Sequence, residues 1–349
     1  MEQGNTLTKQ NERVAYLDTL RVVACLMVIL VHSPHSHEGM TSALSYGVIS
    51  YLCSPCIGLF LMVSGALLLP MHLSTRDFIS KRLTRIVYPL ISWSLIYILI
   101  SIFVGKNTFQ SGIMELIKIP FGCVTGFAHG WYLYLIIGIY LFLPIFNSWI
   151  GANEKRRCEY YLVFWAATMC YPYLMALVGG GIQTYTLIEF SGYFGYVVLG
   201  YYLRKYPISL ASFKQWSLLI VASIILCAML PAIVFLANIP NYDTYSLIIY
   251  NYQGIHTVMM CVLIFVLIQN FNASNKYIQS FMRHFSNLSF GIYLVNFTIL
   301  REVCKPYFQQ NPLTPVELEI LITFVFSTVV SYVIIWIISK MPFKKYIIG

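Results

Sequence analysis

Ten runs of apolar residues, each about 17–25 residues long and nearly free of charge, dominate this chain of 349 residues. A run of that length is what an α-helix needs to cross the hydrocarbon core of a bilayer. Backbone groups in lipid must be hydrogen-bonded within the spanning structure, and these runs lack the alternating pattern of barrel strands. The sequence therefore predicts an all-α integral membrane protein, a bundle of about ten transmembrane helices.

The expected spans are joined by polar segments too short to enclose a core of their own. The sixth and ninth spans are interrupted by polar side chains such as Glu189 and Asn296. We expect a cytoplasmic tail over 1–14, one transmembrane domain over 15–340 and a short cytoplasmic tail over 341–349. In chain order the spans cover residues 15–33, 47–70, 86–104, 132–150, 160–179, 184–203, 216–237, 254–271, 286–304 and 317–339.

Lysine and arginine are distributed unevenly between the two sets of connecting segments. With ten spans and a cytoplasmic N-terminus, 18 of the 22 Lys and Arg residues fall on the cytoplasmic side. This excess follows the positive-inside rule, so both termini are expected in the cytoplasm. The net charge of +9 is then explained by topology and by attraction to anionic membrane lipid. It requires no nucleic acid as a partner.

The first span carries two ionisable side chains on one face. Arg21 and His32 are eleven positions apart, about three helical turns or roughly 16 Å along the helix axis. Ionisable groups within a span are costly and by default mark a functional site. Arg21 alone is explained equally well as a snorkelling anchor. An imidazole titrates near neutral pH and suits proton transfer, although a lone histidine such as His32 is structural about as often.

Two further motifs lie at the cytoplasmic start of the third span and within the second span. Arg82-Leu83-Thr84-Arg85 places two guanidinium groups on one helix face, a geometry that suits a phosphate. Taken alone, this motif is explained more simply as positive-inside charge. Ser64-Gly65 lies in the middle of the second span and permits close approach of another helix, with a substrate-channel role for Ser64 as the second interpretation.

The outer ends of the spans carry histidine, tryptophan and cysteine. His129 and Trp131 stand at the entrance of the fourth span, where they could shape a substrate mouth or belong to the aromatic belt. The run His32-Ser33-Pro34-His35-Ser36-His37 could suggest a metal site, but Pro34 breaks the helix, and no metal site is predicted. Cys53 and Cys56 stand alone in an apolar helix and are expected to serve packing.

Taken together and in order, these motifs resemble the acyltransferase-3 family of membrane O-acyltransferases, in the branch similar to surface-polysaccharide O-acetyltransferases. No single motif is specific, but the ordered set is, and it runs from about residue 13 to about residue 340. The stretches that carry the resemblance are Leu17-Asp18-Thr19-Leu20-Arg21 with His32, Phe60-Leu61-Met62-Val63-Ser64-Gly65, Arg82-Leu83-Thr84-Arg85, His129-Gly130-Trp131-Tyr132-Leu133, Phe194-Gly195-Tyr196-Val197-Val198-Leu199-Gly200-Tyr201-Tyr202 and Ser289-Phe290-Gly291-Ile292-Tyr293-Leu294.

The resemblance implies transfer of an acyl group from a cytoplasmic acyl-CoA to a hydroxyl of a cell-surface or lipid-linked glycan. The donor would be acetyl-CoA or another short acyl-CoA, with no permanently bound cofactor, and the location a bacterial cell membrane. The family's arginine–ten residues–histidine pattern falls on Arg21 and His32, and its paired arginines on Arg82 and Arg85. The expected roles are catalysis by His32 and Arg21, donor binding by Arg82, Arg85 and Arg21, and acceptor binding by His129, Trp131 and Ser64.

Two departures from the family pattern affect these expectations. The last motif commonly ends in histidine, and this chain has Asn296 there, so no chemistry is assigned to that position. The chain also stops at Gly349, without the extracytoplasmic hydrolase-like domain of many larger relatives. Acyl transfer is therefore expected to finish within the membrane part or to pass to a partner. The oligomeric state cannot be read from the sequence.

The residues leave two mechanisms and two other classes of function open. His32 can act as general base on the acceptor hydroxyl, which typically contributes about 10²–10⁴-fold, or carry the acyl group as a nucleophile. We favour the general base. The alternative class is a transporter or flippase for a polysaccharide or lipid-linked sugar, which has no need of a phosphate clamp at Arg82 and Arg85. A membrane sensor or scaffold would not need His32.

Overall fold

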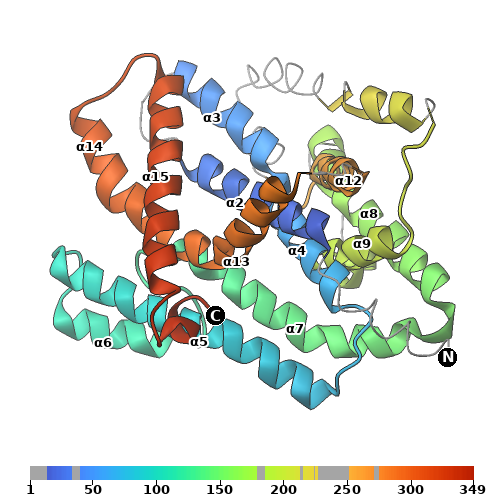
Figure 1. Cartoon of the computed structure of the whole chain (residues 1–349), viewed down its shortest axis with the longest axis horizontal. Coiled ribbons are helices and arrows are strands. Elements are labelled where there is room, and N and C mark those ends of the chain that lie inside the picture. Colours follow the sequence, from blue (N-terminus) through green and yellow to red (C-terminus); the bar gives the residue numbers. More distant parts are fainter. Residues whose placement is uncertain are drawn as a thin grey trace.

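The computed structural model describes residues 14–33, 40–178, 185–212, 215–223, 225–226, 251–270 and 275–349. Within these ranges every regular element is a helix, which confirms the all-α prediction (Figure 1). The α-helices are α2 (Ala15–His32), α3 (Met40–Cys53), α4 (Pro55–Leu68), α5 (Thr75–Phe103), α6 (Phe109–Lys118), α7 (Trp131–Ile150), α8 (Glu154–Val178), α9 (Phe194–Lys205), α12 (Ile255–Asn270), α13 (Lys276–Ile299), α14 (Lys305–Gln310), α15 (Val316–Ile338) and α16 (Lys344–Ile347). Short 3₁₀ or π turns are η2 (Ala128–Gly130), η3 (Gly151–Asn153), η4 (Tyr185–Phe190) and η5 (Leu300–Cys304).

Five segments of the described chain are long and apolar enough to cross a bilayer. They match the first, second, third, fourth and tenth predicted spans, so the protein is a membrane protein, and the count of ten spans stays a prediction. The shorter apolar helix α12 coincides with the eighth predicted span. The five segments are Ala15–His32, Gly47–Leu68, Thr75–Phe103, Ala128–Ile150 and Val316–Ile338.

Three predicted spans differ from the described helices or fall outside them. The second span consists of α3 and α4, which meet at Ser54-Pro55, because proline fits the first turn of a helix but not its interior. The sixth, predicted over 184–203, is helical in the α form only from Phe194. Its first part is the 3₁₀ turn η4, which ends before Gly192, where φ is +92°. Most of the seventh span, 216–237, lies outside the described residues.

Helix α2 lies at the centre of the bundle, where it packs against α3, α4, α12, α13 and α15 (Figure 1). Leu20, Ala24 and Ile29 on this helix are fully buried. A further link is polar, because Ser286 Oγ on α13 donates a 2.8 Å hydrogen bond to the buried carboxylate of Asp18. The helix that carries Arg21 and His32 is therefore held on several sides.

Glycines set the crossing of α4 and α9. A Cβ atom built on Gly65 would stand 1.8 Å from the carbonyl oxygen of Val197, and one built on Gly200 would stand 2.0 Å from that of Met62. Each helix thus presses a glycine against the backbone of the other, as small residues allow in membrane bundles. The close approach predicted at Ser64-Gly65 is confirmed for Gly65.

Candidate functional site

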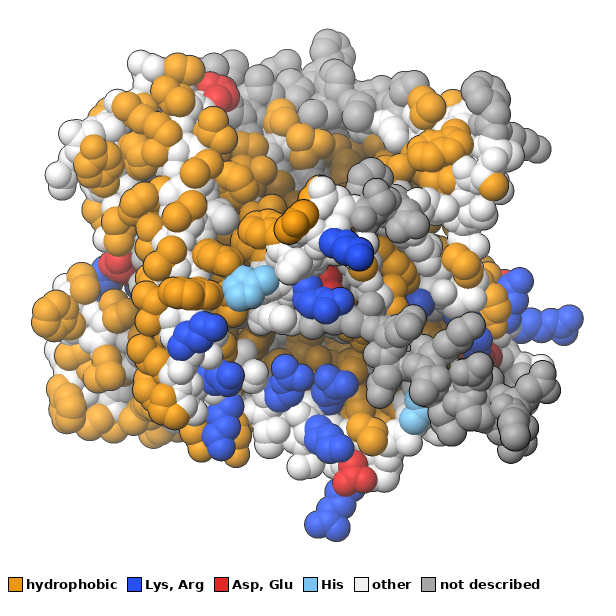
Figure 2. Space-filling view, viewed as in Figure 1, with side chains coloured by type: hydrophobic (Ala, Val, Ile, Leu, Met, Phe, Trp, Pro, Cys, Tyr) orange, Lys and Arg blue, Asp and Glu red, His pale blue; other side chains and the backbone are white. Residues whose placement is uncertain are grey.

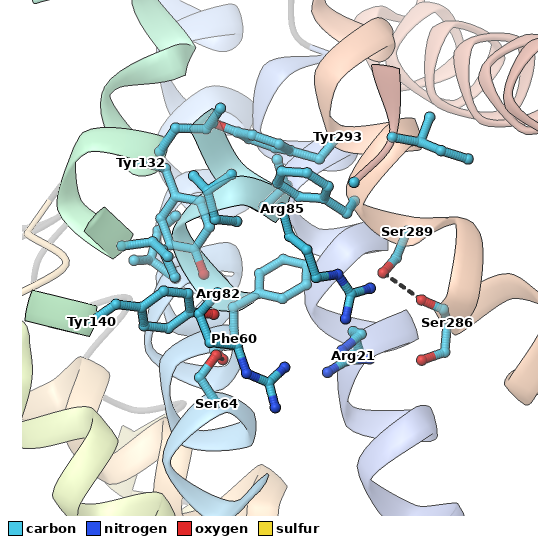
Figure 3. A pocket seen from close by; sticks show the side chains of 18 of the residues that line it. Arg21, Phe60, Ser64, Arg82, Arg85, Tyr132, Tyr140, Ser286, Ser289 and Tyr293 are labelled. Carbon is cyan, nitrogen blue, oxygen red and sulfur yellow. Dashed lines mark hydrogen bonds between the residues drawn. The ribbon is translucent and has the colours of Figure 1, made fainter. Parts of the chain in front are cut away.

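A cavity of about 270 Å³ opens between α2, α4, α5, α7 and α13 (Figure 3). It collects side chains from motifs that are far apart in the sequence. Of the seven residues predicted to act, it brings together four: Arg21, Arg82, Arg85 and Ser64. The lining consists of Arg21, Val28, Ile57, Phe60, Ser64, Arg82, Arg85, Ile86, Tyr132, Leu133, Ile136, Tyr140, Ser286, Asn287, Ser289, Phe290, Tyr293, Ile348 and Gly349.

Three arginines gather at one end of the cavity. Figure 3 shows the guanidinium groups of Arg21, Arg82 and Arg85 close together there. Among the described residues that line the cavity there is no Asp or Glu. Like charges repel, so this end of the cavity favours a ligand with several negative charges, and guanidinium groups match phosphate oxygens.

The local sequence explains how α5 presents its two arginines. Ser74 caps the helix by accepting a 3.2 Å hydrogen bond from the backbone N–H of Asp77, and its hydroxyl donates a 2.7 Å bond to the Asp77 carboxylate. The cap fixes where the helix starts and thus which residues face the bundle. Arg82 is half-buried and Arg85 exposed, so both can be reached from outside. On the face shown in Figure 2, Lys and Arg side chains gather around a hollow near the middle.

One face of α7 lines the cavity with tyrosines. Tyr132, Ile136 and Tyr140 are spaced by four residues and therefore share a face. Figure 3 shows Tyr132 and Tyr140 directed into the cavity. The Tyr132 ring packs 6.1 Å from the Phe60 ring and 5.8 Å from the Tyr293 ring, and its hydroxyl makes no hydrogen bond within the described part of the chain. Both tyrosines can offer hydroxyl donors to a ligand next to the arginines.

The two predicted histidines lie beyond the cavity rather than in its wall. His32 is one helical turn after Val28, which lines the cavity. The ring centroids of His32 and His129 lie 5.5 and 4.5 Å from that of Phe297. The Tyr293 hydroxyl, from the cavity wall, donates a hydrogen bond to the His129 carbonyl oxygen. The structure thus brings His32 and His129 to the same ring, next to the end of the cavity opposite the arginines.

His129 is held in a box of aromatic rings. Its side chain is 6% exposed, and the rings of Tyr97, Phe127, Tyr293 and Phe297 lie 4.5–5.7 Å from it. Within the described residues, neither of its ring nitrogens has a hydrogen-bond partner. Buried polar groups are nearly always bonded, so this imidazole is a candidate to contact a substrate group or water. Trp131, in contrast, is 37% exposed and packs near Tyr193 and Tyr252.

Side chains from two other elements, η5 and α7, fix the loop before His129. Arg301, from the π turn η5, donates a 2.9 Å hydrogen bond to the carbonyl oxygen of Gly126. The Tyr134 hydroxyl bonds the carbonyl oxygens of Ile119 and Gly122 at 2.6 and 2.7 Å. Since the loop carries His129 into its aromatic box, these bonds set the position of that imidazole.

Glu115 secures the same loop from α6. Its carboxylate accepts a 2.6 Å bond from Lys118 Nζ and a 2.8 Å bond from the backbone N–H of Thr125. Burial alone would raise the pKa of Glu115, but the bonds to Lys118 and Thr125 outweigh it, and the pKa is lowered from its ordinary value. The ionised carboxylate therefore stabilises the loop.

Sequence reasoning missed the tyrosines and the end of the chain. Tyr132 was named only as part of the motif His129-Gly130-Trp131-Tyr132-Leu133, although its spacing of eight residues from Tyr140 places both on one face of α7 and could have found the pair. Ile348 and Gly349 lie in a segment expected to be a short tail. Asn296, to which no chemistry was assigned, is 1% exposed.

The remaining motifs do not join the cavity. His35 and His37 lie outside the described residues. In the part of the chain that is described, no three His, Cys, Asp or Glu side chains are grouped to hold a metal ion. Cys53 and Cys56 are both buried and free, as packing residues are.

Comparison with known proteins agrees with the motifs. The model of an acyltransferase domain family matches residues 14–340, nearly the whole chain. No curated protein and no solved structure matches the chain. On the family match, this chain belongs to the acyltransferase-3 family.

Proposed function

We propose that this protein is a membrane O-acyltransferase that moves a short acyl group, acetyl in the first instance, from acyl-CoA to a hydroxyl of a cell-surface or lipid-linked glycan. Family membership supports acyl transfer in general. The observation that carries the choice of donor is the cavity lined by Arg21, Arg82 and Arg85 without a carboxylate among its described lining residues. Coenzyme A is a polyanion with a long neutral arm, and few other acyl donors require three guanidinium groups.

The size of the cavity suits part of the donor. Pockets that enclose a drug-sized ligand usually measure about 300–1,000 Å³, and this cavity measures about 270 Å³. We assign the arginine end to the phosphates of CoA. The neutral arm then runs along Tyr132 and Tyr140 towards Val28 and Tyr293. This path carries the thioester to the end of the cavity that adjoins His32.

The proposed chemistry takes place at the end of the cavity that adjoins His32. The acceptor oxygen attacks the thioester carbonyl carbon while His32 takes the hydroxyl proton as general base. The carbon–sulfur bond then breaks, and the CoA thiolate leaves and regains a proton from the imidazolium. The Tyr132 hydroxyl, on the cavity wall, donates to the thioester oxygen as negative charge develops on it. His129, with Trp131 further out, binds the acceptor.

We also infer the orientation in the membrane. The arginines belong on the cytoplasmic side, where acyl-CoA is made and where positive residues concentrate. His129 and its loop then face outward, towards the glycan, in a bacterial cell membrane with both termini in the cytoplasm. No permanently bound cofactor is needed in this scheme, because CoA supplies the acyl group.

The test is CoA binding by the purified protein in nanodiscs, measured by calorimetry. A hydrogen bond to a charged group contributes about 1.5–3 kcal/mol, so Arg82→Ala/Arg85→Ala should weaken CoA binding by about 100-fold or more. The control is Arg76→Ala/Lys81→Ala, which removes two positive charges from the same helix outside the cavity. Equal losses in both double variants would refute a specific clamp and would support a different function, such as sugar transport.

A second measurement separates donor binding from chemistry. His32→Ala should bind CoA as the wild type does and should transfer no acyl group to the glycan. Mass spectrometry of surface glycans from cells with each variant reads out the transfer and names the acyl group. Transfer at near wild-type rate by His32→Ala would exclude the role given to this imidazole.

A further inference from the structure

The last residues of the chain form part of the cavity wall. Helix α16 (Lys344–Ile347) is followed by Ile348 and Gly349, and both of these residues line the cavity that holds the arginines. The family match ends at residue 340, so this segment lies beyond it. We call residues 343–349 the C-terminal strap.

The strap is bound firmly to α5. Trp93 Nε1 donates a 2.9 Å hydrogen bond to the carbonyl oxygen of Ile347, and the Trp93 side chain is 4% exposed. The rings of Tyr88 and Tyr346 pack 5.2 Å apart. Gly349 approaches the backbone so closely that a Cβ atom there would stand 2.7 Å from the carbonyl oxygen of Arg85. The strap thus contacts the backbone of a residue assigned to donor binding.

On its other side the strap fits against α13. A Cβ atom built on Gly291 would stand 2.7 Å from Cγ2 of Ile348, so the glycine leaves the space that the isoleucine fills. Phe290, next to Gly291, lines the cavity with Ile348 and with Ile86 of α5. The strap therefore lies between α5 and α13, two helices that form the cavity, and completes an apolar part of the wall.

We propose that the C-terminal strap is a component of the acyl-donor site, in which Ile348 and Gly349 form the wall that contacts the neutral arm of acyl-CoA. This inference rests on the proposed function, which assigns the cavity to that donor. The arginines hold the phosphates, and the arm needs an apolar, water-excluding surface, which Ile348, Ile86 and Phe290 supply. Removing that surface opens the cavity between α5 and α13 and weakens the fit of the arm.

The test compares two substitutions within the strap, using calorimetry with CoA and the full-length protein in nanodiscs. Ile348→Trp puts a larger side chain at the cavity wall, and we expect CoA binding to weaken about tenfold or more because the added volume displaces the arm. Tyr346→Trp is the matched control, because Tyr346 is 42% exposed and does not line the cavity. We expect its affinity to stay within about twofold of the wild type.

A labelling experiment keeps the inference testable where Ile348→Trp fails to fold. Ile348→Cys and Tyr346→Cys are treated with a maleimide with and without CoA, in a background whose reactive native cysteines are replaced. CoA should slow labelling at position 348 and leave labelling at position 346 unchanged. Wild-type CoA affinity in folded Ile348→Trp, or equal labelling at 348 with and without CoA, overturns the role of the strap alone. Absence of CoA binding by the wild-type protein overturns the proposed function and this inference with it.

Discussion

Replacing Gly65 by alanine tests how closely α4 and α9 must pack for the cavity to keep its shape. The new Cβ atom would stand 1.8 Å from the carbonyl oxygen of Val197, whereas ordinary contact begins at 3.4 Å. The two helices must therefore separate locally by the difference, about 1.6 Å. Overpacking of this kind costs about 1–3 kcal/mol, and the better helix propensity of alanine returns at most about 1 kcal/mol. We expect a net loss of about 1–2 kcal/mol in the free energy of unfolding.

The same shift reaches the candidate site. Ser64 precedes Gly65 and Phe60 lies about one turn earlier, and both line the cavity on α4. A displacement of about 1 Å can reduce a reaction rate by about 100-fold when reacting groups are held by the protein. Gly65→Ala should therefore lower the rate of acyl transfer by about two orders of magnitude. This loss is far larger than the loss of activity expected from the small fraction of protein that the substitution unfolds.

The assay is thermal unfolding in nanodiscs together with the initial rate of acyl transfer. Gly138→Ala is the matched control, because Gly138 lies within α7 and a Cβ atom there would have no neighbour within 4 Å. The control should be at least as stable as the wild type and equally active. The packing argument is refuted if Gly65→Ala and Gly138→Ala have the same unfolding temperature and the same rate.

Two other substitutions give independent predictions. Tyr132→Phe keeps the ring and removes the hydroxyl, so kcat for acyl transfer should fall by about 10–100-fold with CoA affinity unchanged. An unchanged kcat, measured from initial rates of acyl transfer, would exclude a hydrogen bond to the thioester oxygen. Because the pKa of Glu115 is lowered from its ordinary 4.5, its stabilisation is complete at neutral pH and is lost as the pH falls through the folded pKa. Glu115→Gln should therefore unfold at a lower temperature than the wild type at pH 7 and show a smaller change between pH 7 and about pH 4 in melting curves; equal pH dependence of both proteins would contradict this account.

The sequence predicts the helical class, and four of the seven site residues predicted from it line the cavity. Arg82 and Arg85 line the cavity together because residues three apart share a helix face, which spacing alone reveals. What spacing cannot reveal is which helices lie next to each other. That depends on contacts such as the one between Gly65 and the backbone of α9.

Two features of the site could not be predicted from the sequence, for physical reasons. His32 lies one helical turn after Val28, next to the end of the cavity that Val28 and Tyr293 line, and spacing along α2 could not show where the cavity ends. The indole of Trp93 and the space left by Gly291 fix the C-terminal strap, residues 343–349. Neither partner is near this segment in sequence, so the sequence indicated only a short cytoplasmic tail.

The lack of acidic side chains among the described lining residues has a consequence for how the protein tells one anion from another. Three guanidinium groups attract any molecule with several phosphates, so ATP and pyrophosphate should compete with CoA at this end of the cavity, and added salt should weaken all three alike. Discrimination among cellular nucleotides must then come from the part of the cavity that carries no charged side chain. Only a molecule with a pantetheine arm can fill that part.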